Sequence, residues 1–169
     1  MVPLFSSIAM QRPKIGRLTL LMFLMGMGIL CAQHPLGNPD SLLGLEYPVL
    51  FERIKQAGQD TIRQQRYLKA YLEKALKENN DAQRVQGYKN YLHRSTGRAR
   101  LAYADSMVLS AISAKDTALI GSAYLTKGIV FYSEKKYKRA LENYLVAEEF
   151  LARTDNAYLH HKLQYNIAL

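Results

Sequence analysis

Apolar side chains recur three and four residues apart through most of the chain beyond Pro48. Within 61–78, for example, Tyr67, Tyr71 and Ala75 stand four residues apart. This is the period of an amphipathic helix, and no proline, the strongest helix breaker, occurs after Pro48. The pattern predicts an all-α domain. The predicted helices are 48–58, 61–78, 80–93, 98–113, 117–133, 137–153 and a last one that begins at Thr154 or Asp155 and still runs at Leu169.

Residues that can cap a helix precede several of these segments. Asp60, Asn80 and Asp116 each stand just before an apolar stripe, where a side-chain oxygen can accept a hydrogen bond from a free backbone N–H of the first turn. Gly97 and the segment 134–136 are predicted turns. These signals place the helix boundaries.

The amino-terminal part has a different pattern. Three basic residues, Arg12, Lys14 and Arg17, precede an apolar run at 18–30, and Ala32 follows shortly after it. This order is typical of a secretory signal. As a helix the run spans about 20 Å, which is short of the roughly 30 Å hydrocarbon core of a bilayer. We therefore expect residues 1–32 to be a signal peptide cut after Ala32, with an uncleaved anchor or a buried core helix as alternatives.

The proline- and glycine-containing stretch 33–46 is predicted to be a linker whose Leu42, Leu43 and Leu45 dock on the first helix. Cys31 is the only cysteine, so cleavage after Ala32 would leave no thiol and no disulfide framework. Export to a bacterial periplasm or cell surface is the expected localisation, and the inner membrane is the alternative if the amino-terminal anchor stays uncleaved.

The net charge of +9 slightly favours the binding of acidic partners.

Neither a catalytic set nor a metal site nor a cofactor site emerges from the sequence. His160 and His161, for instance, are adjacent and would point about 100° apart on a helix. Two basic groups are expected to be solvated turns rather than a nucleic-acid surface. They are Arg94, Arg98 and Arg100, and Lys135, Lys136, Lys138 and Arg139.

One stretch, 121–154, carries a specific motif. An aromatic residue is followed by a glycine and a second aromatic residue, and the next predicted helix has an alanine, an aromatic residue and another alanine. The signature residues are Tyr124, Gly128, Phe131, Tyr137, Ala140, Tyr144 and Ala147. The motif resembles the tetratricopeptide repeat, although Lys127 stands where that family has leucine. The resemblance implies that these residues specify packing between the two helices of a repeat.

A spacing of 40 residues recurs along the chain, from Met107 to Ala147 and from Gly128 to Ala168. It is longer than the usual repeat of about 34 residues. The spacing resembles that of the longer-helix variant of the repeat, which is found in many bacterial sensors. By resemblance, 47–169 forms a right-handed superhelical solenoid of antiparallel helix pairs. Weak repeats are expected at 47–78 and 81–114, the strongest at 121–154, and an incomplete last repeat from 155.

In tetratricopeptide proteins the first helix of each pair lines a groove. The groove positions that this resemblance implies are Ser122, Leu125, Ile129, Tyr132 and Ser133. The expected function is a non-enzymatic protein–protein interaction scaffold that binds a protein or peptide, such as an amphipathic helix or a further part of the same polypeptide. Equally, Leu125 and Ile129 could pack against adjacent repeats.

A second function follows from a narrower resemblance. The order of features resembles the exported repeat region of bacterial regulators that continue into a transmembrane helix and a cytoplasmic helix-turn-helix domain. The chain would then be the sensor fragment of a membrane-spanning transcriptional regulator. Because the last predicted helix stops without its partner, self-association through this uncapped helix is also expected.

Overall fold

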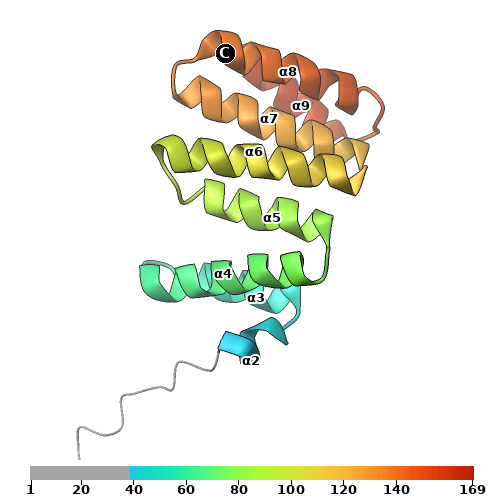
Figure 1. Cartoon of the computed structure of the whole chain (residues 1–169). Helices are drawn as coiled ribbons and strands as arrows, with labels where there is room; N and C mark the ends of the chain where they lie inside the picture. The colour runs from blue at the N-terminus through green and yellow to red at the C-terminus, as the bar shows by residue number, and fades with distance from the viewer. Residues whose placement is uncertain (1–38) are drawn as a thin grey trace, which may run out of the picture. The chain divides into compact units, whose positions relative to one another are not determined.

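The computed structural model describes residues 39–169, and in this part of the chain all regular structure is helical (Figure 1). The prediction of an all-α domain is confirmed for these residues. The predictions for residues 1–38, above all the signal peptide, concern residues outside those described. The helices are α2 (Pro39–Leu43), α3 (Tyr47–Gln56), α4 (Thr61–Lys77), α5 (Asp81–Leu92), α6 (Gly97–Ala114), α7 (Thr117–Ser133), α8 (Tyr137–Leu151) and α9 (Ala157–Ile167). None of these helices is long and apolar enough to cross a membrane.

Three helices begin at the predicted caps. The side chain of Asp60 accepts a hydrogen bond from the backbone N–H of Arg63 at 2.9 Å, which starts α4. The side chains of Asn80 and Asp116 start α5 and α7 in the same way, each accepting from the backbone N–H three residues further on. These bonds satisfy donors that the first helical turn leaves free. The predicted boundaries were accurate here because capping is a local interaction.

Both predicted boundaries of the last helix were wrong. The last helix begins at Ala157 instead of Thr154 or Asp155, because the side chain of Asn156 caps it by accepting from the N–H of Leu159 at 3.1 Å. It ends at Ile167, before the last residue. The predicted linker 33–46 contains α2, whose first residue is a proline, and proline fits the first turn of a helix.

From α3 onward, consecutive helices pack against each other in chain order, whereas α2 packs on α4. The contact between α7 and α8 is the most extensive, followed by that between α5 and α6. Helices two apart also touch, because α5 contacts α7 and α7 contacts α9. Figure 1 shows the result, in which helices joined by short turns run antiparallel to one another.

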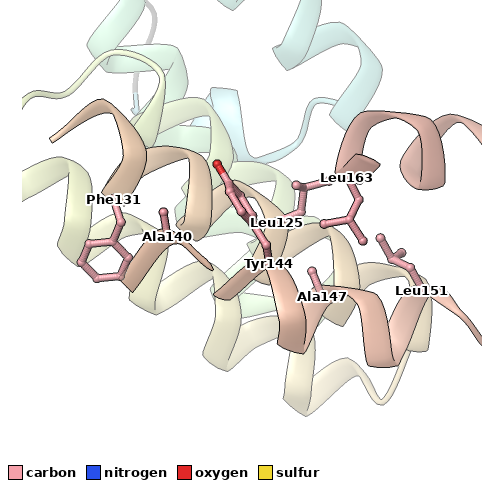
Figure 2. Close-up of a cluster of buried hydrophobic side chains, with 7 residues drawn as sticks. All are labelled: Leu125, Phe131, Ala140, Tyr144, Ala147, Leu151 and Leu163. Atoms are coloured by element: carbon pink, nitrogen blue, oxygen red, sulfur yellow. The ribbon is translucent and has the colours of Figure 1, made fainter. Parts of the chain in front are cut away.

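The interface of α7 and α8 depends on small residues. A methyl group at Gly128 would lie 2.4 Å from Cε1 of Tyr144, and one at Gly121 would lie 2.6 Å from the side chain of Leu151. Ala140 is 1% exposed at the same interface (Figure 2). Gly128 and Ala140 are the residues expected from the sequence at this close approach. The matching role of Gly121 was missed.

At the other end of the described chain, apolar residues of α2, α3 and α4 share a core. Leu42 is buried against Leu50, Ile54 and Leu68, and Leu45 packs beside them. Leu42 and Leu45 thus join a shared core, but α2 packs mainly on α4 rather than on α3, the helix for which docking was expected, and Leu43 is not among the core residues.

Candidate partner-binding surface

Helix α7 carries the five residues predicted to line a groove. Leu125 is 1% exposed and belongs to a buried cluster with Tyr144 and Leu163, which come from α8 and α9 (Figure 2). It therefore offers no surface to a partner. Ile129 and Tyr132 are half-buried and pack against the same cluster.

The two predicted serines lie at the polar edges of this stripe. Ser122 is half-buried, and its backbone carbonyl accepts the hydroxyl of Thr126 at 2.8 Å. Ser133 is exposed and donates its own hydroxyl to the backbone carbonyl of Val130 at 2.8 Å. The part of the predicted groove that remains accessible is therefore centred on the last turns of α7.

A cavity of about 450 Å³, lined by tyrosine and aliphatic side chains together with Asn166, opens beside Tyr132 and is called the apolar cavity below. The ring of Tyr132 meets that of Tyr137 edge-on at 5.3 Å, and its hydroxyl donates to the backbone carbonyl of Leu169 at 3.4 Å. The lining residues come from the end of α7, the start of α8 and the end of the described chain. They are Tyr132, Tyr137, Ala140, Leu141, Tyr144, Asn166, Ile167 and Leu169.

Tyr144 is the most buried aromatic residue of this cavity. Its side chain is 3% exposed, and its hydroxyl has no hydrogen-bond partner within the described residues. Burial, and then the neighbouring Tyr132, raise the pKa of Tyr144 above its ordinary value. A buried hydroxyl without a partner is costly, so a ligand oxygen that accepts its hydrogen bond would be favoured here.

A second cavity, of about 460 Å³, is lined by residues within 96–101 and within 133–136, and it is called the basic cavity because three of its lining residues are cations. Arg100 donates through Nη1 to Oγ of Ser133 at 3.2 Å, and Lys136 pairs with Glu134 at 2.6 Å. Arg98 has no such partner within residues 39–169. The cavity is lined by Thr96, Gly97, Arg98, Arg100, Leu101, Ser133, Glu134 and Lys136.

This basic cavity was missed by sequence reasoning, which treated its cations as two unrelated solvated turns. The signal that could have found it is the 40-residue spacing. Helix α6 begins at Gly97 and α8 at Tyr137, so their starts are 40 residues apart. In stacked repeats such positions would lie side by side, and Arg98 and Arg100 of α6 do share a cavity with Lys136, which directly precedes α8.

The histidines and the signature residues of the repeat do not come together in one further site within residues 39–169. His160 bonds through Nε2 to the backbone carbonyl of Thr154 at 2.9 Å, and His161 is exposed. Within residues 39–169, no three His, Cys, Asp or Glu side chains converge in a way that could hold a metal ion. Of the signature residues, Tyr137 alone is largely exposed, at 57%, while Tyr124 stacks on Phe150 at 6.2 Å.

No protein-family model, curated protein or solved structure matches the chain. The two cavities at the end of α7 are therefore the observations that bear on function.

Proposed function

We propose that the chain is an exported, non-enzymatic scaffold of tetratricopeptide-like repeats that binds a segment of another protein. The observation that carries this proposal is the position of Tyr132 and Ser133. These neighbours on α7 open into an apolar cavity and a basic cavity respectively. Export is proposed from the leader-like order of basic and apolar residues within 1–32.

The helix contacts support a solenoid arrangement. If α3–α4, α5–α6 and α7–α8 are the pairs, the first helices touch in two of the three steps. Helix α5 contacts α7 and α7 contacts α9, while α3 and α5 make no comparable contact. The second helices α6 and α8 make no comparable contact. Closer packing on one side bends a stack of pairs toward that side, and the first helices then line its concave surface.

The two cavities indicate the kind of segment that would fit. Half-buried Tyr132 lines the apolar cavity, which suits one face of an amphipathic helix. The guanidinium of Arg98, which pairs with no carboxylate within residues 39–169, suits a carboxylate on the same segment. We therefore favour a partner with apolar residues at helical spacing that are followed closely by Asp or Glu.

Selection from a library of displayed amphipathic peptides tests this proposal. Selected peptides should carry acidic residues next to their apolar stripe. Arg98→Glu should weaken their binding about tenfold or more, which corresponds to about 1.4 kcal/mol, because it replaces attraction by repulsion. Fluorescence anisotropy with a labelled peptide measures the change.

Lys77→Glu is the matched control, since Lys77 is an exposed cation at the end of α4, away from both cavities. Its affinity for the selected peptides should equal that of the wild type. Peptides without acidic residues, or an equal loss in both variants, would contradict the proposed mode of binding.

The 40-residue spacing favours a second candidate, the sensor fragment of a membrane-spanning transcriptional regulator. Helices α6 and α8 begin 40 residues apart, as do α7 and α9, and this period resembles the long repeats of bacterial sensors. The nucleotide sequence downstream of the Leu169 codon tests this candidate when read in all frames. It should encode an apolar span followed by a helix-turn-helix domain.

A further inference from the structure

Helix α8 has an exposed stripe with apolar residues in its middle and opposite charges at its ends. Lys138, Leu141, Leu145 and Glu148 follow one another at steps of three, four and three residues, which places them on one helix face. Leu141 is 48% exposed and Leu145 is 50% exposed. These four residues are called the α8 stripe below.

The charged ends of the α8 stripe are free. Neither Lys138 nor Glu148 forms an ion pair with any other residue in the part of the chain that the structure describes. Both residues are exposed. The α8 stripe therefore presents unpaired charges of both signs around an apolar centre.

The preceding pair of helices indicates what covers the position of Leu141. Leu101 on α6 is the equivalent of Leu141, because α6 begins at Gly97 and α8 at Tyr137. Leu101 is half-buried and packs against the apolar cluster formed by α7, α8 and α9. In this fold the position is thus occupied by a neighbouring helical pair, and a second copy of the chain can supply one.

The charge pattern of the α8 stripe is complementary to itself when the helix is reversed. Turning α8 end to end about the position of residue 143 exchanges Lys138 with Glu148 and Leu141 with Leu145. We propose that two copies of the chain dimerise through antiparallel α8 helices around this point. Each Lys138 then faces Glu148 of the second copy, and each Leu141 faces Leu145.

This arrangement is a two-fold symmetric contact in which the same surface serves both copies. It also follows the pairing of apolar positions in antiparallel coiled coils. A parallel pairing would place Lys138 against Lys138 and Glu148 against Glu148, and the like charges would repel each other. The charges therefore select the orientation, while the leucines supply the buried apolar surface.

The contact is small, because one helix of each copy provides most of it. Stable interfaces bury about 800 Å² per partner, and smaller ones are weak and transient. We expect a dissociation constant of about 1–100 µM. Among the four residues of the stripe, only Leu141 also lines the apolar cavity, so the test uses the other three.

Sedimentation equilibrium of the full chain tests the proposal, in a non-ionic detergent that keeps the apolar segment 18–30 in solution. The wild type should dimerise with increasing concentration. Leu145→Asp should weaken the dimer about tenfold or more, since it places two carboxylates in the apolar centre. Leu109→Asp is the matched control, because Leu109 is 66% exposed on α6 and outside the stripe.

Charge exchange tests the antiparallel orientation separately from folding. Lys138→Glu and Glu148→Lys should each weaken the dimer, because each places like charges opposite one another. The double variant Lys138→Glu, Glu148→Lys should restore wild-type association. Rescue by the double variant cannot come from improved folding, and circular dichroism should show the same helix content in all variants.

The proposal would be overturned if the wild-type chain stayed monomeric up to about 1 mM, well above the expected dissociation constant. A further helical pair or a different protein would then be the partner that covers the stripe. A dimer insensitive to Leu145→Asp would also overturn the proposal, since association would then run through another segment. A double variant as weak as the single ones would overturn the antiparallel orientation.

Discussion

Gly128 decides how closely α7 and α8 approach. A methyl group at this position would lie 2.4 Å from a ring carbon of Tyr144 and 3.2 Å from the backbone oxygen of Ala140. Real side chains do not tolerate the shorter distance, so either the ring or the helix would have to move. Both neighbours are nearly fully buried. A single missing side chain therefore sets the geometry of the candidate surface, because Tyr144 also lines the apolar cavity.

We expect Gly128→Val to lower the free energy of unfolding by about 2–3 kcal/mol, the range of overpacked cores. The valine methyl groups must displace the buried ring of Tyr144. Urea denaturation followed by circular dichroism measures the loss. The control is Gly44→Val, because Gly44 is exposed and a Cβ there would be 3.7 Å from its nearest neighbour. Equal losses in the two variants would contradict the close-approach argument.

At the scale of elements, a small polar network joins α2, α3 and α4. The carboxylate of Glu78, just beyond the end of α4, accepts a hydrogen bond from the ammonium of Lys74 and one from the hydroxyl of Tyr47, both at 2.6 Å. Lys74 also donates to the backbone carbonyl of Leu43 at 3.1 Å. The bond from Lys74 and then that from Tyr47 lower the pKa of Glu78 below its ordinary value of 4.5.

The sign of the pH dependence follows from that lowered pKa. A carboxyl with a lower pKa in the folded state stabilises the fold above its unfolded pKa, and this contribution is lost as the pH falls through the folded value. The stability of the wild type should therefore fall as the pH decreases below about 4.5. Glu78→Gln should be less stable than the wild type at pH 7, and the difference should shrink in acid.

Thermal denaturation at pH 7, 5 and 3 measures this difference. Glu142→Gln is the control, because Glu142 is exposed on α8 and forms no ion pair within residues 39–169. Its stability should follow that of the wild type at each pH. A constant gap between wild type and Glu78→Gln from pH 7 to pH 3 would show that the network does not depend on ionised Glu78.

At the scale of the molecule, helix packing and apolar burial differ in extent along the described chain. The α7–α8 contact is the most extensive, and α9 packs far less on α8. Helix α9 has one fully buried side chain, Leu163, whereas α7 has eight buried residues. Because apolar burial is the main source of stability, opening should begin where burial is least.

Hydrogen exchange of the native protein should therefore be slowest in α7 and α8 and fastest in α9. Mass spectrometry of peptides from each helix gives the protection. Measurements at protein concentrations below the dimer dissociation constant separate this gradient from self-association through α8. Uniform protection from α3 to α9 would mean that the described helices open as one unit.

Much of the local structure could be predicted from the sequence. The starts of α4, α5 and α7 follow from Asp60, Asn80 and Asp116, because each cap bonds only three residues away. The helical period likewise needs only neighbouring residues. The start of α9 was missed because Thr154, Asp155 and Asn156 are all able to cap, and the structure uses Asn156.

The candidate surface depended on contacts between distant residues. The family resemblance left Leu125 either in an open groove or packed against neighbouring helices, and packing against α8 and α9 buries it. The sequence pattern also placed Arg98 and Lys136 in two separate turns. In the structure both residues line one cavity, because α6 and α8, which begin at these turns, both pack against α7. The sequence by itself thus determined where the described helices lie along the chain, since caps and periodicity are local. Only the tertiary structure decided which of their faces remain open to a partner, because burial depends on which helices become neighbours.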